Sequence, residues 1–244
     1  MLWTFLLPAL ALFAILLFWF LLRNRPKKME NVLITEHTYR KALSNKEILR
    51  TAISLLIFLV VGAALDLAYT KGFTQIYTNN ETSSLIYLPI SFFLALGIND
   101  VYFYFSHRFL HWKFLFKNVH HIHHQSHYPN PWSSFSFHPV EAVIQIGIIP
   151  LVAMVLPIHS YVLIGFSAFM LLVSVYGHCG YELRANKPPI FAIFNNSIHH
   201  NQHHQFFKYN FGLYLNLWDR IFKTNHPTYD EVTEKFKLKA NYKH

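Results

Sequence analysis

The sequence predicts an all-α integral membrane protein: a bundle of four or five transmembrane helices with a cytosolic, histidine-rich cap that holds a di-metal site. Three observations lead to this fold class. The 244 residues are 53% hydrophobic and only 14% charged, whereas soluble domains carry about 25% charged residues. Apolar runs long enough to cross a bilayer recur along the chain. Of the 17 histidines, 14 lie between His107 and His204.

The first two expected spans are joined by a basic loop. Residues 2–22 are almost wholly apolar, and basic residues follow them directly. Because a signal peptide carries its positive charges before the apolar run, we interpret this segment as a retained helix whose N-terminus lies outside the cytosol. A second span is expected at 48–69. The basic residues that place the loop in the cytosol are Arg23, Arg25, Lys27, Lys28, Arg40, Lys41, Lys46 and Arg50.

Three further apolar segments complete the predicted bundle. Residues 85–105 form a third span that returns to the cytosolic side, because the loop at 71–84 is polar and nearly uncharged. A glycosylation acceptor at 80–82 would lie in that outer loop. Residues 140–156 and 161–176 are expected to form a helical hairpin that enters and leaves the membrane from one side. The expected parts of the chain are therefore 1–30 (first span and basic stop), 31–106 (two spans), 107–139 (two histidine clusters), 140–178 (hairpin) and 179–244 (third cluster and C-terminal cap).

Three histidine clusters have the spacing of a helical metal-binding site. The first is a pair four residues apart, and the second and third each contain three histidines at i, i+3 and i+4. This spacing places the rings of each cluster on one helical face. The eight residues are His107 and His111, then His120, His123 and His124, then His200, His203 and His204.

Eight imidazoles are too many for one tetrahedral or octahedral ion, so we expect two ions with about four rings each. Neutral imidazole binds iron, zinc, copper and nickel, and open coordination positions could bind O₂ or water. Cys179 is the only cysteine, which excludes a cysteine-based metal site. Isolated histidines such as His159 and His226 are expected on the surface or in loops.

Around these clusters the sequence resembles the fatty acid hydroxylase/sterol desaturase superfamily. The resemblance covers about residues 99–224. The three clusters match the family's H-x3-H, H-x2-HH and H-x2-HH boxes, and residues 137–141 (FHPVE) resemble its F-H-P-x-[DE] stretch. Residues 210–212 (NFG) and 217–220 (LWDR) resemble its C-terminal motifs, and 203–210 (HHQFFKYN) is most similar to the sterol C5-desaturase branch.

The resemblance implies a membrane-bound di-iron oxidoreductase. Such an enzyme uses O₂ and external electrons to hydroxylate or desaturate an unactivated C–H bond of a lipid, such as a sterol, fatty acyl chain, sphingoid lipid, ether lipid or carotenoid. The implied electron donor is a b-type cytochrome with its reductase, or a ferredoxin. The implied cofactors are two iron ions, and a purified sample could carry zinc instead. The implied location is the endoplasmic reticulum in a eukaryote or the inner membrane in a bacterium.

Three residues near the boxes are candidates for contact with the site. His178 is the candidate for a ninth ligand, because the predicted hairpin returns it to the cytosolic face near the third cluster; a histidine at a helix terminus is also favoured by the helix dipole. Asp100 lies two turns before His107 on one helical face, where a carboxylate could orient this or another ring. His138 resembles a family histidine and is expected to have a structural role or to contact a ligand residue.

The remaining polar neighbours are assigned less direct roles. His121 and His199 point away from the other histidines of their clusters, so they are expected beside the site or facing the cytosol. Glu141 could contact the site or serve as a charge at a helix N-terminus. Asp219 is expected to form a structural pair with Arg220.

Other classes of protein agree less well with these patterns. The net charge is +9, and the basic residues that produce it flank the apolar spans. This arrangement suits anionic membrane lipids rather than nucleic acid. A metal transporter would carry its ligands near mid-membrane on helices related by a repeat. Haem needs only two axial ligands, and the sequence has no H-E-x-x-H zinc protease motif. The remaining alternative is a non-catalytic or metal-handling membrane protein, either a transporter or a degenerate enzyme.

Overall fold

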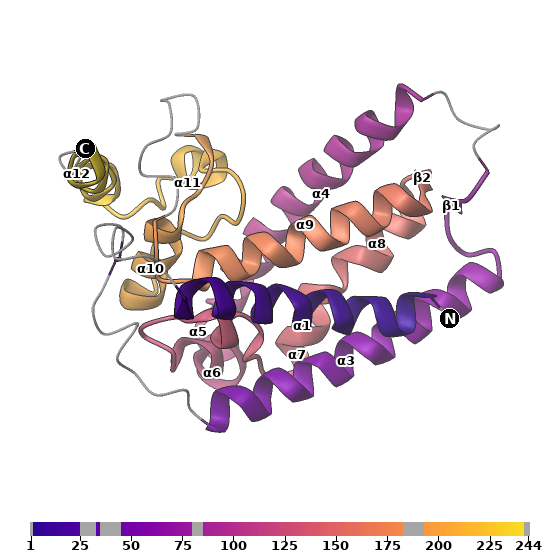
Figure 1. The fold of residues 1–244 in the computed structure, drawn as a ribbon, viewed down its shortest axis with the longest axis horizontal. Coiled ribbons are helices and arrows are strands. Elements are labelled where there is room, and N and C mark those ends of the chain that lie inside the picture. The colour runs from indigo at the N-terminus through magenta and orange to yellow at the C-terminus, as the bar shows by residue number, and fades with distance from the viewer. Residues whose placement is uncertain (1, 25–32, 35–44, 80–84, 183–192, 242–244) are drawn as a thin grey trace.

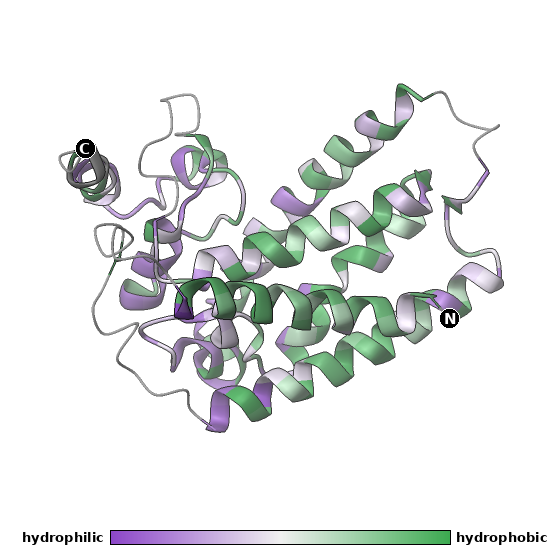
Figure 2. Ribbon diagram, viewed as in Figure 1, coloured by the Kyte–Doolittle hydropathy of each residue, from purple (hydrophilic) through white to green (hydrophobic). Residues whose placement is uncertain are grey.

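Four helices in the computed structural model are long and apolar enough to cross a membrane: α1 (Leu2–Arg23), α3 (Asn45–Thr70), α4 (Tyr87–Leu110) and α9 (Ser160–His178) (Figure 1). The structure describes residues 2–24, 33–34, 45–79, 85–182 and 193–241. Only 28% to 33% of the most apolar stretch of each helix is buried within the protein. The long helices are predominantly hydrophobic along their length (Figure 2), as expected where the remaining faces contact lipid. The prediction of a helical membrane protein is thereby confirmed.

The segment expected as the first arm of a hairpin forms two short helices instead of a full span. α7 (Pro139–Ile146) and α8 (Ile148–Val155) follow each other across Gly147. Together they fall short of the roughly 20 residues that cross a hydrocarbon core. His138 begins α7: its Nδ1 accepts a hydrogen bond from the Val140 amide at 3.2 Å, and Pro139 occupies the first helical position. Of the two roles predicted for His138, the structure shows the structural one.

α1 packs along α3 through a close backbone approach and a side-chain cap. A Cβ atom at Gly62 would collide with the Trp3 backbone, so only glycine permits this separation of the two helices. Asp66 accepts hydrogen bonds from the Trp3 amide at 3.2 Å, the Thr4 amide at 2.9 Å and the Thr4 hydroxyl at 2.6 Å. These amides lie in the first turn of α1 and have no partners within the helix. Asp66 therefore fixes the start of α1 on α3.

One end of the bundle is closed by two short strands. β1 (Ile76–Tyr77) pairs in parallel with β2 (Ile158–His159). His159 is buried and belongs to β2, so its expected position on the surface or in a loop is wrong. Its Nδ1 accepts a hydrogen bond from the Tyr161 amide at 3.2 Å, which caps the start of α9.

The opposite end carries the histidine clusters (Figure 1). The end of α1, the start of α3 and the ends of α4 and α9 all reach this side, where Figure 2 shows the hydrophilic segments gathered. The elements of this cap are α5 (Lys113–Leu115), the π-helix η3 (Phe116–His120), α6 (His121–His124), the 3₁₀ helix η4 (Pro131–Phe135), α10 (Ser197–Phe206), α11 (Leu217–Ile221) and α12 (Tyr229–Asn241). The predicted acceptor at 80–82 and the basic residues Arg25, Lys27, Lys28, Arg40 and Lys41 lie outside the described residues.

Candidate metal centre

Nine histidines from distant parts of the sequence form two groups at the cap end of the bundle. Within each group, one ring nitrogen of every residue lies within 4.8 Å of those of all the others. The first group is His107, His111, His120, His124 and His203, and the second is His123, His178, His200 and His204. The structure thus brings together all eight box histidines and His178.

The second and third boxes each contribute to both groups. η3 ends at His120 and α6 continues from it, so His120 and His124 point to the first group while His123 points to the second. α10 divides in the same way: His203 joins the first group, and His200 joins the second. The π-helical turn of η3 is a geometry that occurs frequently at functional sites. Both groups therefore share α6 and α10, while α4 and η3 complete the first group and α9 completes the second.

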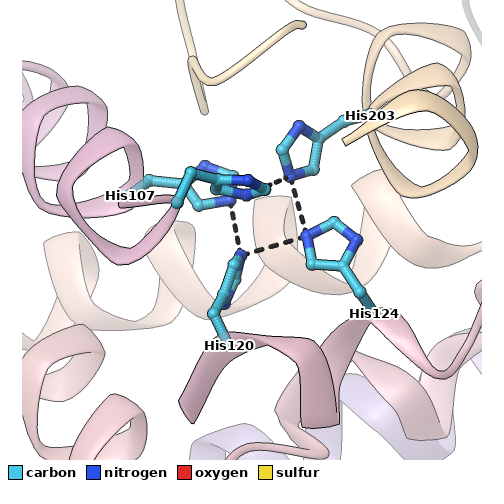
Figure 3. Close-up of side chains that lie close together, drawn as sticks. His107, His120, His124 and His203 are labelled. Carbon is cyan, nitrogen blue, oxygen red and sulfur yellow. Dashed lines mark hydrogen bonds between the residues drawn. The ribbon is translucent and has the colours of Figure 1, made fainter. Parts of the chain in front are cut away.

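The ring nitrogens of the first group face one another at short range. Nε2 of His120 lies 3.2 Å from Nε2 of His107 and 3.1 Å from Nε2 of His124, and Figure 3 marks both contacts with dashed lines. Nε2 of His203 lies 3.1 Å from Nε2 of both His124 and His111. The second group repeats this arrangement, with Nε2 of His178 at 3.2 Å from His123 and 3.0 Å from His200, and His204 at 3.1 Å from His200.

Outer hydrogen bonds determine which nitrogen of several rings points inward. Nδ1 of His107 lies 2.9 Å from the Phe211 carbonyl, Nδ1 of His203 lies 2.6 Å from the Tyr209 carbonyl, and Nδ1 of His178 lies 2.7 Å from the Ser174 carbonyl. A carbonyl oxygen can only accept, so each Nδ1 carries the hydrogen and each Nε2 holds a lone pair. This is the orientation found in metal-binding histidines.

The inward nitrogens fit a metal ion better than they fit one another. The single lone pair on Nε2 of His203 faces both His111 and His124, yet it can accept only one hydrogen bond. The spacings of 3.0 to 3.2 Å equal the distance of roughly 3.0 Å between adjacent ligands at right angles around an ion with ~2.1 Å metal–nitrogen bonds. The donor set therefore suits an ion with five or six ligands.

The imidazoles are held in the neutral form that binds metals. Burial lowers the pKa of His120, His124 and His203 well below the usual range, because the charged form loses its hydration. Neighbouring imidazoles lower it further, since two positive rings would repel each other. The same causes lower the pKa of His200 and His204 in the second group.

Glu141 is the carboxylate that contacts a box histidine. Its Oε1 lies 2.7 Å from Nδ1 of His120, and both side chains are fully buried. Asp100 was the residue expected in this role, and the structure corrects that expectation. Nδ1 of His107 donates to a carbonyl, and Asp100 accepts a hydrogen bond from the Leu215 amide at 3.1 Å. Asp100 thus holds the chain that follows the third box.

Asp219 organises the loop behind the first group. It accepts hydrogen bonds from the Phe211 amide at 2.9 Å, the Gly212 amide at 2.7 Å, the Thr224 hydroxyl at 2.6 Å and Nε2 of His199 at 3.1 Å. Burial opposes ionisation of this carboxyl, but the hydrogen bonds, beginning with His199, outweigh it and hold its pKa below the ordinary value. His199 accordingly lies beside the site and outside both groups.

The expected pair between Asp219 and Arg220 is wrong, because the two side chains point to different partners. Arg220 lies 2.8 Å from Asp230 on the surface, while Asp219 is buried.

His121 is exposed, since it occupies the face of α6 opposite the clustered rings. It therefore faces solvent, one of the two positions expected for it.

A cavity leads from the bundle interior to both groups. It is lined by box histidines including His107, His120 and His123, by apolar side chains such as Phe135 and Met170, and by Glu141. An apolar groove on the outer surface of α4 and α9 is lined by Phe93, Leu96 and Phe169. Val173, Tyr176 and Asn195 line both spaces. The cavity beside the histidines and the groove on the outer surface therefore share part of their walls.

The fold and the site define a helical membrane protein with a polyhistidine cluster that could hold metal. The model of the fatty acid hydroxylase family matches residues 92–224, which is more than half of the chain. The chain therefore belongs to the fatty acid hydroxylase family. The resemblance predicted from the histidine boxes is thereby confirmed.

Several relatives are similar over most of the chain. Lathosterol oxidase of Rattus norvegicus is 32% identical over 79% of this chain and 64% of its own length. Delta(7)-sterol 5(6)-desaturase of Leptosphaeria maculans is 30% identical over 69% of this chain and 46% of its own length. Sphinganine C4-monooxygenase 2 of Arabidopsis thaliana is 30% identical over 84% of this chain and 77% of its own length. The chain thus spans less than two thirds of the first two relatives. No solved structure matches the chain.

Proposed function

We propose that this protein is a membrane-bound di-iron oxidoreductase that uses O₂ and external electrons to hydroxylate or desaturate an unactivated C–H bond of a lipid. The observation that carries this proposal is the convergence of nine Nε2 atoms into two groups at the end of a membrane bundle. Imidazole ligands suit iron. Membership of the fatty acid hydroxylase family favours iron over the zinc that the same ligands would also bind.

Each group of histidines holds one ion in this proposal. The first ion is held by five rings and the second by four, the groups being those defined above. When bound, the two ions would activate O₂, which is the oxidant that breaks a C–H bond. The protein's own contribution is to orient the rings through the Phe211, Tyr209 and Ser174 carbonyls and to keep bulk water from the buried cavity.

A lipid substrate is supported by the relatives and by the surface of the bundle. The relatives are named for lathosterol, for a Δ7-sterol and for sphinganine, all of which are lipids. The apolar groove at Phe93 and Phe169 shares residues with the cavity beside the histidines. We therefore place the entry of the lipid at this shared wall, which lies between the groove and the cavity.

The histidine end faces the cytosol in this proposal. Arg23, Lys46, Arg50 and Arg108 lie near the span ends on that side, and cytoplasmic flanks of membrane helices are enriched in such residues. A cytosolic site would be accessible to a b-type cytochrome with its reductase, or to a ferredoxin, as electron donor.

Metal analysis of purified protein tests this function. Wild-type protein expressed with iron is expected to contain about two equivalents, and His203→Ala is expected to retain at most about one, because it removes a ligand of the first group. His121→Ala is the matched control: it lies in the second box but is exposed, and it should keep both ions. Wild-type protein without bound transition metal, or equal metal content in His203→Ala and His121→Ala, would overturn the proposal.

A further inference from the structure

The metal centre comes close to the protein surface at one point. His111 is the only partly exposed histidine of the two groups, and two phenylalanines, here called the aromatic pair, cover it and its neighbour. The ring centroid of Phe116 lies 5.1 Å from that of His111 and 5.5 Å from that of His124. Phe207 lies 5.0 Å from His124 and 5.8 Å from Phe116. Both phenylalanines are partly exposed, so the aromatic pair connects the surface with the first group.

The backbone holds Phe207 over the site in a conformation that phenylalanine rarely adopts. Phe207 ends α10 with a positive φ of 59°, a conformation in which glycine or asparagine is the usual residue. Its amide donates a hydrogen bond to the His203 carbonyl at 2.8 Å, so the turn itself needs only the backbone. The presence of phenylalanine at this position therefore indicates that its side chain has a use beyond the turn.

The surface around the aromatic pair is basic. Lys117 and Lys208 each directly follow one of the two phenylalanines, and both lysines are exposed. Neither forms an ion pair with a residue that the structure describes. Residues 101–140 and 183–218 contain no aspartate or glutamate. Glu47, which reaches this part of the cap from the start of α3, is buried. The two lysines therefore give this surface a positive charge that no acidic side chain of these segments offsets.

The neighbours of the aromatic pair are polar, which favours contact with water over contact with lipid. The ring centroid of His121 lies 5.9 Å from that of Phe116, and that of His127 lies 5.6 Å from that of Phe207. Both of these histidines are exposed. The exposed aromatic residues that suit a membrane interface come earlier in the chain and are Phe109, Trp112 and Phe114. The basic surface therefore suits a soluble acidic partner better than lipid headgroups.

We propose that the surface formed by Phe116, Lys117, Phe207 and Lys208 is the docking face for an acidic one-electron carrier protein that reduces the metal centre. This inference rests on the proposed function and locates the binding of its electron donor. Complementary charge steers such a carrier to the lysines. Electron transfer slows steeply with distance, so docking is favoured where the first group comes nearest to the surface.

The electrons of this step balance over two docking events. In each event the carrier loses one electron, which passes at the aromatic pair to a ferric ion held by the first group. Two carriers supply the two electrons that a hydroxylation consumes: R–H, O₂, two electrons and two protons from water give R–OH and H₂O. The carrier is released oxidised after each event, so docking has to be reversible. A small, charge-dependent surface suits such a transient contact.

Binding of purified carriers to protein in phosphatidylcholine nanodiscs tests the docking face. The acidic probes are the soluble domain of a b-type cytochrome and a plant-type ferredoxin, and the basic probe is a c-type cytochrome. At least one acidic probe should bind, with an affinity that falls about 10-fold or more between about 20 and 200 mM salt because salt screens the charges. The basic probe should bind at least about 10-fold more weakly at low salt. Failure of both acidic probes to bind, or equal binding of the basic probe, would overturn the proposal.

Charge reversal connects the binding to the two lysines. Lys117→Glu and Lys208→Glu should each weaken binding of the acidic probe about 5-fold or more, since reversing a unit charge a few ångströms away in water has an effect of this order. The double variant should bind the basic probe more tightly than wild type does, a gain that a misfolded protein would not show. Lys71→Glu is the matched control, because it makes the same change at an exposed lysine beyond the other end of α3. Equal effects of Lys117→Glu and Lys71→Glu would refute the docking face.

Three measurements on the same samples separate the possible failures. Anaerobic rapid mixing with reduced carrier should show slower reduction of iron-loaded Lys117→Glu and Lys208→Glu than of wild type, and equal rates would overturn the proposal. Retained lipids are measured by mass spectrometry: if the double variant loses only anionic lipid and binds carriers as before, the surface serves lipid headgroups and the proposal fails. If wild type holds two equivalents of iron but binds no carrier, the oxidoreductase stands without this docking face. Wild type without metal would refute the proposed function and this inference together.

Discussion

Replacing Asp219 by asparagine should destabilise the protein strongly, although the two side chains have the same shape. The wild-type carboxylate accepts four hydrogen bonds inside the protein, from His199, Phe211, Gly212 and Thr224. Asparagine keeps one acceptor oxygen and turns an NH₂ group toward donors, so at least one buried N–H group loses its partner. Loss of a buried charged partner costs about 3–5 kcal/mol, which corresponds to a fall of roughly 10 °C in Tm for a chain of this size.

The assay is thermal unfolding of purified protein in detergent, with Asp230→Asn as the matched control. Asp230 also forms an ion pair, with Arg220, but both side chains are at least half exposed, and such pairs contribute little. The control should therefore shift Tm by at most about 2 °C. Asp219→Asn should also weaken metal binding about 10- to 100-fold. Asp219 holds the amide of Phe211, and the carbonyl of Phe211 in turn accepts the hydrogen bond that orients His107. Equal Tm values for the two variants would refute this reasoning.

Two further predictions concern pH and helix packing. Lowering the pH from 7.5 to 5.5 should lower the Tm of the metal-free protein, because the unfolded chain binds protons near pH 6.5 that buried rings such as His120 and His124, with pKa values held well below that range, do not bind. Each such ring removes about 1.4 kcal/mol of stability per pH unit below 6.5, and a Tm that rises over this interval would contradict the assignment. Gly62→Ala should lower Tm by roughly 3–10 °C, because its methyl group collides with the Trp3 backbone. Gly165→Ala, whose added atom meets nothing within 4 Å, should leave Tm unchanged or raise it, because alanine favours the helix. Equal effects of the two variants would show that α1 and α3 are not closely packed.

The spacing of the histidines predicted the composition of the site because that spacing is local. Rings at i, i+3 and i+4 lie on one face whatever the helix packs against, so the boxes could be recognised before their partners were known. His178 could also be predicted, because it ends a span that returns to the cap. The division of the second and third boxes between the two groups depends on how the short helices pack against each other, and the spacing within a box does not specify that packing.

The partners of the rings could not be predicted, because they come from distant segments and from the backbone. The carbonyl that holds His107 belongs to Phe211, 104 positions away, and a carbonyl is present at every residue. The nearest signal was the motif at 210–212, where Asn210 adopts a positive φ of 61° and supports the turn that presents this carbonyl. Asp100 lay on the correct face of α4 but was too far along the helix, and the structure places Leu215 against it instead.

The sequence order of the nine histidines also determines when the centre can form during biosynthesis. The first group runs from His107 to His203 and the second from His123 to His204, so neither is complete until the third box has been translated. All four helices long enough to span a membrane precede His200 in the sequence, so they are synthesised before the third box. In the proposed function, neither ion could gain its full set of ligands before that box is present. Until then, the membrane helices are held together by contacts between the helices themselves, among them those of Asp66 and Gly62.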